Sequence, residues 1–256
     1  MSSKITYEQP LNERIRTFLR LEYLFAELDH YISAPTEWDS RNVISTLLNI
    51  IDFLTRSDIK SEIIKELERH ATTLATLETS PAVDNQRLHI ILDEINNNLA
   101  LLRDSAYQPG QSLRENEFIM SIKQRSSIPG GSCNFDLPGY HHWLHKPFSE
   151  RNRQLEEWQI DLFAIKRGMD LSLQMIRNST NTSFEKAERG FYQRPIESNT
   201  ACQMIRVVLP DNSKYFPEIS GGRHRFTIRF MEQLSNSERP LQSADTVEFE
   251  LHCCIL

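Results

Sequence analysis

The chain has 256 residues, 39% of them hydrophobic and 25% charged, which is typical of a globular protein that forms one large domain or two small ones. Its net charge of −6 argues against a general nucleic-acid binder, which needs a basic surface. No apolar run approaches the roughly 20 residues of a membrane span, and the first residues lack the apolar segment of a signal peptide, so we expect a cytoplasmic protein.

Apolar residues repeat every three or four positions along the first two thirds of the chain, which predicts amphipathic helices. The first helix begins near Pro10 or Asn12 and ends before Ser33-Ala-Pro. Three more apolar stripes cover residues 43–54, 59–74 and 88–102, and Asp84 is a candidate N-cap for the last of these. A shorter helix is expected over 114–125, and one continuous helix from Phe148 to about Asn178.

After about residue 180 the apolar period changes to two, which is typical of half-buried antiparallel strands. The alternation covers 205–209, 226–230 and 247–251, and two further segments, 4–8 and 190–193, are candidate edge strands. We therefore predict an α+β fold, with a mainly helical N-terminal part packed with a C-terminal antiparallel β-sheet that an N-terminal strand joins. The expected domains are a helical domain at 9–180 and a β domain at 181–256 plus strand 3–8.

The segment at 125–145 has a distinctive composition. Two Pro-Gly turns and a cluster of aromatic and histidine residues fall within it, which indicates a fixed backbone shape and a binding surface. The sequence contains no dinucleotide or phosphate-binding glycine motif, no nucleophile elbow and no zinc-protease motif. We therefore expect neither an enzyme nor a cofactor.

The three histidines of this segment are the basis of an alternative function. His141 and His145 are four residues apart, a spacing that suits two imidazoles on one zinc ion, and His142 lies between them. A third ligand would come from Cys133 or His252. The alternative is thus a cytoplasmic metal-binding protein or metalloenzyme, whereas a purely structural interpretation places the histidines around aromatic packing.

The four cysteines are expected to be free thiols, because disulfide frameworks are rare in the cytoplasm. Two of them, Cys253 and Cys254, are adjacent. This pair is compatible with metal binding, with a vicinal disulfide, or with partly buried thiols at the end of a strand.

Several arginines are arranged in pairs of like charge. Arg16 and Arg20 lie one turn apart on the first helix, and Arg225 and Arg229 lie on the same face of one strand, which Arg206 is expected to share. Such pairs are mutually repulsive and indicate acidic partners; RNA is a further possible partner that the acidic total charge disfavours. The alternative is internal pairing, for which the candidates are Glu13, Glu27, Glu248 and Glu250.

Several motifs, in the same order and spacing nearly end to end, resemble the ZapD family of bacterial cell-division proteins. They are LNERIRTFLRLE (11–22), RSSIPGGSCNFDLP (125–138), WLH (143–145), PEISG (217–221), RFTIRFM (225–231) and FELHCC (249–254). The resemblance implies a non-enzymatic homodimer that binds the C-terminal tail of FtsZ, bundles FtsZ filaments and is recruited to the division site at midcell.

The resemblance also implies which side chains bind the tail. That tail mixes acidic and apolar residues, so arginines beside exposed apolar surface are the expected receptor. The residues that match the family's motifs are Arg16, Arg20, Arg56, Arg114, His141 and Arg225. Glu117 follows Arg114 in a region where a further basic residue is expected in some family members, which makes the expected patch less positive.

Overall fold

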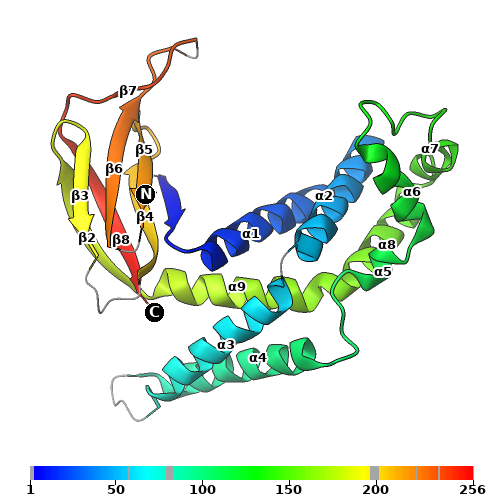
Figure 1. Ribbon diagram of the computed structural model, residues 1–256, viewed down its shortest axis with the longest axis horizontal. Helices are drawn as coiled ribbons and strands as arrows, with labels where there is room; N and C mark the ends of the chain where they lie inside the picture. The colour runs from blue at the N-terminus through cyan, green and yellow to red at the C-terminus, as the bar shows by residue number, and fades with distance from the viewer. Residues whose placement is uncertain are drawn as a thin grey trace. The chain divides into compact units, whose positions relative to one another are not determined.

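The computed structural model describes residues 3–56, 58–78, 83–196, 202–222, 224–235 and 237–255. Helices occupy the first two thirds and antiparallel strands the last third, with one strand ahead of the first helix, so the predicted α+β fold is confirmed (Figure 1). The chain forms two compact units. The strand unit comprises Met1–Phe18 and Leu173–Leu256, and the helical unit comprises Leu19–Ser172.

The boundary between the units falls within two helices, the first and the last. The helices are α1 (Glu13–Ile32), α2 (Glu37–Arg56), α3 (Ile59–Ala75), α4 (Asn85–Arg103), α5 (Gln111–Arg114), α6 (Glu117–Ser126), α7 (Pro138–Leu144), α8 (Phe148–Gln159) and α9 (Phe163–Asn178). Within the described ranges, no helix combines the length and the apolar character that crossing a membrane requires.

Side-chain caps fix where three of these helices begin. Asp58, Asp84 and Asn116 each accept a hydrogen bond from the backbone N–H three residues later, at 3.2, 3.2 and 3.1 Å. A short polar side chain at this position satisfies an N–H that has no partner within the helix. The N-cap predicted at Asp84 is thus confirmed.

The single helix predicted from Phe148 to Asn178 is wrong, because a 3₁₀ turn at Ile160–Leu162 separates α8 from α9. Asp161 supplies the physical reason. Its carbonyl oxygen accepts a hydrogen bond from the Tyr107 hydroxyl at 2.7 Å, and its carboxylate accepts one from the backbone N–H of Ser112 at 2.9 Å. These tertiary bonds compete with the regular helix pattern in a way that apolar periodicity does not reveal.

Arg151 connects three segments inside the helical unit. Its side chain is 5% exposed, and it donates hydrogen bonds to Ser40 Oγ (3.1 Å) and to the carbonyl oxygens of Leu144 (2.9 Å), Lys146 (2.6 Å) and Pro35 (2.7 Å). A buried guanidinium group is tolerated only when its donors are satisfied. Arg151 therefore holds the turn before α2 and the end of α7 against α8.

The strands form two antiparallel sheets rather than the one sheet that the sequence predicted. One sheet has the order β1-β4-β8-β2, and the other has β3-β6-β5 with β7 paired to β6. The strands are β1 (Lys4–Pro10), β2 (Thr180–Ala187), β3 (Phe191–Pro195), β4 (Cys202–Pro210), β5 (Tyr215–Gly221), β6 (Arg225–Glu232), β7 (Leu241–Gln242) and β8 (Val247–Ile255). The predicted edge strands at 4–8 and 190–193 lie in β1 and β3, each at the edge of its sheet.

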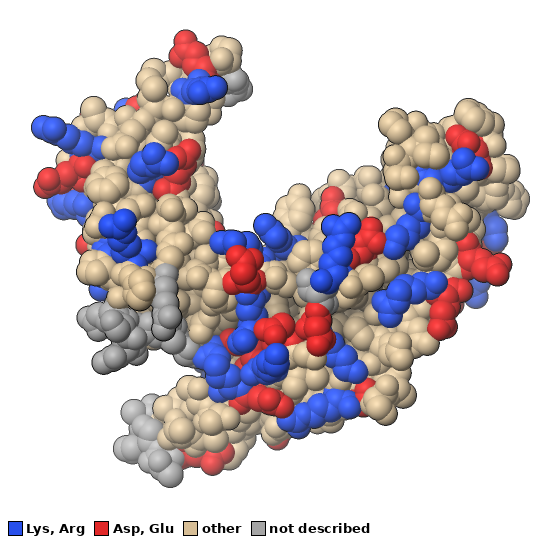
Figure 2. Space-filling view, viewed as in Figure 1, with Lys and Arg blue, Asp and Glu red and all other residues tan. Residues whose placement is uncertain are grey.

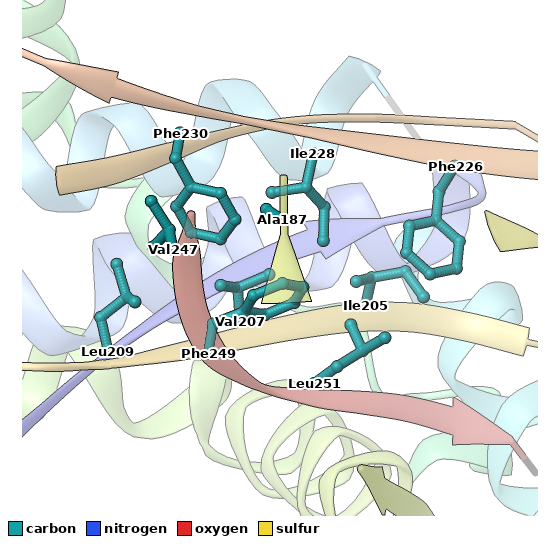
Figure 3. Packing of buried hydrophobic residues seen from close by; sticks show 10 residues of the cluster. All are labelled: Ala187, Ile205, Val207, Leu209, Phe226, Ile228, Phe230, Val247, Phe249 and Leu251. Atoms are coloured by element: carbon teal, nitrogen blue, oxygen red, sulfur yellow. The ribbon is translucent and has the colours of Figure 1, made fainter. Parts of the chain in front are cut away.

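The apolar faces of the two sheets pack against each other (Figure 3). Phe226, Ile228 and Phe230 alternate along β6 and are 0–1% exposed, and they face buried residues of β4 and β8. A sheet with one apolar face must bury that face, and a second sheet provides the cover. The apolar residues whose alternation predicted the strands therefore form the core of the strand unit.

The strand β1 joins this unit although it precedes all the helices. It pairs with β4 along its whole length, from Lys4 opposite Pro210 to Pro10 opposite Met204. Glu8 on β1 lies between two arginines of the same unit, Arg177 at the end of α9 and Arg206 on β4. The predicted return of the N-terminal strand to the sheet is confirmed.

Candidate partner-binding site

A pocket of about 520 Å³ lies in the helical unit where the end of α2, the start of α3 and the turn after α4 meet. Arg56 is the last residue of α2 and Arg114 the last residue of α5, and both line this pocket. Lys60, Tyr107 and Asp58 supply other polar groups of its wall. We call these five residues the cationic pocket, since three of them carry positive charge and one carries negative charge.

The turn after α4 positions Arg114. Gln111 N–H donates to the carbonyl oxygen of Gln108 at 3.1 Å, and Gly110 in this turn has φ +72°. This combination, with Pro109 before the glycine, is the pattern of a type II turn, which requires positive φ at its third residue. Arg114 then donates a hydrogen bond to the carbonyl oxygen of Pro109 at 2.9 Å, which holds its stem beside the turn.

Lys60 and Tyr107 form another part of the pocket wall. Lys60 Nζ donates hydrogen bonds to the carbonyl oxygens of Asp104 (3.1 Å) and Tyr107 (2.6 Å), and it lies 5.4 Å from the centre of the Tyr107 ring. The Tyr107 hydroxyl donates to Asp161, and burial raises the pKa of this phenol to about 12. The aromatic ring and the ammonium group are therefore fixed by the fold.

The acidic member of the pocket is occupied by its own helix. Hydrogen bonds from Ser61 lower the pKa of the Asp58 carboxyl, with smaller contributions from Lys65 and Lys60. Asp58 caps α3 and so uses its charge at the helix N-terminus. Arg56 and Arg114, in contrast, have no carboxylate partner among the described residues. The pocket therefore retains positive charge for an anionic ligand.

The remaining predicted site residues do not line this pocket. In the helical unit, Arg20 is exposed on α1, and His141 lies on α7 with its ring 4.4 Å from that of His145. In the strand unit, Arg225 is exposed beside a hollow of about 420 Å³ that Ser220 and His224 also line. Neither Arg20 nor Arg225 has an ion-pair partner in the described parts of the chain.

Internal pairing explains the other arginines of the predicted patch. Arg16 lies 2.5 Å from Glu13 on the same helix, as the internal alternative expected. Arg229 pairs with Glu218 on the neighbouring strand at 3.1 Å. The expectation that Arg206 shares a face with Arg225 and Arg229 is wrong, because β4 and β6 belong to different sheets.

The predicted partners Glu27, Glu248 and Glu250 bind other groups. Glu27 accepts a hydrogen bond from Thr46 at 3.0 Å. Glu248 pairs with Lys186 and Glu250 with Lys4, each at 2.7 Å. These three carboxylates, which were candidate partners of the arginines, therefore bind other side chains. Arg20 and Arg225 remain available to bind an acidic partner.

The histidine segment forms a local packing arrangement. His145 Nδ1 lies 2.9 Å from the carbonyl oxygen of His141, and its Nε2 lies 3.6 Å from Glu37. Trp143 stacks on Trp158 with ring centres 5.7 Å apart. Within the ranges that the structure describes, no three His, Cys, Asp or Glu side chains are grouped to hold a metal ion.

The third ligands considered for such a metal are also engaged elsewhere. Cys133 Sγ donates to Asp136 at 3.2 Å, and His252 Nε2 lies 2.8 Å from Glu250. Cys133 belongs to the helical unit and His252 to the strand unit. No observation therefore favours the metal alternative.

The family resemblance named Arg56 and Arg114 of this pocket, but neither it nor the residue patterns named Lys60 and Tyr107. The loop containing Tyr107 is marked by Pro-Gly, so the turn itself was detectable. That α3 begins beside this turn depends on the packing of α3 against α4, which no local signal reports. On the face shown in Figure 2, basic and acidic side chains are interspersed on both units, so a defined pocket is a more specific feature than surface charge.

Comparison with known proteins decides the family. A family model described as "ZapD: Cell division protein" matches residues 19–229, most of the chain. The chain belongs to the ZapD family. The Cell division protein ZapD of Methylococcus capsulatus (strain ATCC 33009 / NCIMB 11132 / Bath) is similar at 40% identity over 256 residues, which is 100% of both chains.

Other ZapD relatives match over nearly the same extent. Those of Coxiella burnetii (strain RSA 493 / Nine Mile phase I) and Azoarcus sp. (strain BH72) are each 36% identical, over 99% and 98% of this chain and 99% and 100% of their own. The family assignment supports a role in cell division, and these relatives are named as cell-division proteins rather than as enzymes. The resemblance to the ZapD family that the sequence motifs indicated is thus confirmed.

Proposed function

We propose that this ZapD-family protein is a non-enzymatic adaptor that binds the C-terminal tail of FtsZ and, as a homodimer, crosslinks FtsZ filaments at midcell. The observation that supports this most directly is the cationic pocket. Arg56 and Arg114 come from different elements, line one pocket and have no carboxylate partner in the described chain. Guanidinium groups so placed suit the carboxylates of an acidic peptide.

The same pocket suits the apolar part of such a tail. Leu54, Ile59 and Pro109 contribute to its wall beside the charged groups, and the Tyr107 ring adds an aromatic surface. A segment that mixes acidic and apolar residues would therefore place its carboxylates on Arg56 and Arg114 and its side chains on this wall. Arg20, His141 and Arg225 are proposed as further contacts, whereas Arg16 is already paired with Glu13.

Dimerisation would convert a weak tail contact into crosslinking. A protomer with one tail-binding site holds a single filament, whereas two linked sites hold two, with the second binding step governed by effective concentration. Because the contact is largely electrostatic and solvent-accessible, the affinity should fall as salt increases.

The test is sedimentation of FtsZ polymers with the full-length protein, using intact FtsZ and FtsZ that lacks its C-terminal tail. We expect the protein to pellet with intact polymers only, and less so at high salt. The variant Arg56→Ala/Arg114→Ala should bind at least about tenfold more weakly, which corresponds to about 1.4 kcal/mol. Pelleting with the tail-less polymers at the same affinity would disprove tail binding.

A matched control removes the same charge elsewhere. Arg87 and Arg153 are exposed on α4 and α8, do not line the pocket and have no ion-pair partner in the described chain. Arg87→Ala/Arg153→Ala should therefore bind like the unmodified protein. If the two double variants lose affinity equally, general charge rather than the cationic pocket is responsible. Thermal melts of both variants exclude loss of folding as the cause.

A further inference from the structure

Cys202 and Cys253 lie side by side at one end of the strand unit. Cys202 is the first residue of β4, Cys253 lies near the end of β8, and these two strands pair antiparallel. The Cys202 thiol donates to the carbonyl oxygen of Met204 at 3.7 Å, and both cysteines line one pocket and pack against the apolar core between the sheets. The fold therefore brings together two thiols that are far apart in the sequence.

The backbone at this point is irregular. The register between β4 and β8 shifts between Cys202 and Met204, which marks a β-bulge. A bulge leaves one residue out of the ladder and bends its strand, so the strand end can adjust more readily than a regular ladder can. Two sulfur atoms must come close together to form a disulfide, and these two lie at the strand end that can adjust.

A pocket of about 160 Å³ opens onto the two thiols. Arg194 and Asn181 contribute its polar lining, and Phe226 and Ile255 contribute apolar surface. One water molecule takes about 30 Å³ of the liquid, so the pocket has room for a molecule as small as hydrogen peroxide.

The two thiols differ in pKa because their surroundings differ. The nearby Cys202 thiol lowers the pKa of Cys253 and outweighs burial, which raises it; the positive charge of Arg194 lowers it further, and Glu185 acts in the opposite direction. The same contact between the thiols, together with burial, raises the pKa of Cys202. Cys253 is thus the thiol that ionises first, and Cys202 retains its proton.

We propose that Cys253 and Cys202 form an oxidisable dithiol whose substrate is a peroxide and whose product is a disulfide between β8 and β4. The Cys253 thiolate attacks one oxygen of hydrogen peroxide, the O–O bond breaks, and the departing hydroxide takes up a proton to become water. The resulting sulfenic acid is attacked by the sulfur of Cys202, so that the S–S bond forms, the S–O bond breaks and a second water leaves with the thiol proton. Two thiols lose two electrons, and the peroxide gains them.

The neighbouring Cys254 is not part of this pair. Successive residues of a strand point to opposite faces, so Cys254 is directed away from the pocket that Cys253 lines. It is fully buried, and burial raises the pKa of its thiol to about 11. A vicinal Cys253–Cys254 disulfide is therefore disfavoured.

The experiment is peptide mapping of the full-length protein after treatment with a small excess of hydrogen peroxide near pH 7.5. Remaining thiols are alkylated, and the protein is digested without reductant. We expect one linked pair of peptides, one containing Cys202 and the other Cys253, which dithiothreitol separates. Full alkylation of both cysteines, or a disulfide within the single peptide that holds Cys253 and Cys254, would overturn the proposal. This map uses the unmodified sequence and does not depend on how any variant folds.

Variants assign the roles of the two thiols. In Cys202→Ser, Cys253 should accumulate as a sulfenic acid that dimedone traps, because the resolving thiol is gone. Arg194→Met should slow oxidation severalfold at the same pH, whereas Cys133→Ser, which changes a thiol of the helical unit, should leave the rate unchanged. An unchanged rate in Arg194→Met, or dimedone on Cys133 rather than Cys253, would contradict the assignment.

Discussion

Glu8 accepts two hydrogen bonds from the guanidinium group of Arg177, one from Nε at 2.9 Å and one from a terminal nitrogen at 2.7 Å. The same carboxylate lies 2.9 Å from Nε of Arg206 on β4. One acidic residue of β1 therefore joins the end of α9 to the sheet in which β1 pairs. Because the side chain of Glu8 is only 18% exposed, water does not easily replace either contact.

Replacing this carboxylate should weaken the strand unit. Glu8→Gln removes the negative charge beside two guanidinium groups and one of the two oxygens that accept from Arg177, and we expect the free energy of unfolding to fall by about 1–3 kcal/mol. Urea denaturation followed by circular dichroism measures the change. Glu188→Gln, which alters an exposed carboxylate, is the control and should unfold at the midpoint of the unmodified protein. Coincident curves for all three proteins would show that Glu8 contributes no stability.

The helical unit should depend on Arg151 in a comparable way. Arg151→Met keeps the length of the side chain but leaves the buried Leu144 carbonyl and Ser40 hydroxyl, and two part-buried carbonyl groups, without their donor. We expect a loss of at least about 3 kcal/mol, since each buried acceptor without a partner costs roughly 1–3 kcal/mol. Arg153→Met on the same helix changes an exposed arginine and should stay within about 0.5 kcal/mol of the unmodified protein. Equal denaturation midpoints for the two variants would refute a clamping role.

Gly110 links the turn after α4 to the cationic pocket. A side chain at its φ of +72° is strained, and a Cβ there would lie 3.3 Å from a terminal nitrogen of Arg114. We expect Gly110→Ala to cost about 1–2 kcal/mol of stability and to weaken FtsZ binding as Arg114 is displaced. Gly139→Ala is a matched control, because its Cβ would meet nothing within 4 Å. The prediction fails if Gly110→Ala binds FtsZ as tightly as Gly139→Ala does.

The phenol of Tyr107, in the cationic pocket, should lose its proton only at high pH. Burial raises the pKa of Tyr107, and also that of Tyr140, from 10.0 to about 12. Because the folded state favours the neutral phenol, the associated stability is fully present below pH 10 and is lost as the pH rises toward 12. In a spectrophotometric titration of phenolate, Tyr107→Phe should remove part of the late step, whereas the exposed Tyr23→Phe should leave that step unchanged. A late step of full amplitude in Tyr107→Phe would contradict the burial argument.

Patterns of local residues predicted the elements of the fold well. The alternation along Phe226, Ile228 and Phe230 gave a strand, because period two is a property of the strand itself. Asp84 was identifiable as a cap because a capping residue lies within three positions of the group it satisfies.

Features set by distant partners were not predictable in this way. The break between α8 and α9 depends on Asp161 meeting Tyr107, and the division into two sheets depends on which strands pair. Arg56 and Arg114 were singled out by family motifs rather than by their proximity, which only the packing of α2, α3 and the following turn establishes. The prediction for Arg206 was wrong for the same reason, because alternation shows which residues of one strand share a face but not which strands belong to the same sheet.

The pairing of β1 with β4 also bears on synthesis at the ribosome. All residues of the helical unit are contiguous, so that unit can fold as soon as Ser172 has left the exit tunnel. The strand β1 emerges first but has to wait for β4, and β4 in turn is flanked by β8 near the other end of the chain. Until then both edges of β1 are unpaired, and its charged residues Lys4 and Glu8 disfavour premature pairing with other nascent chains.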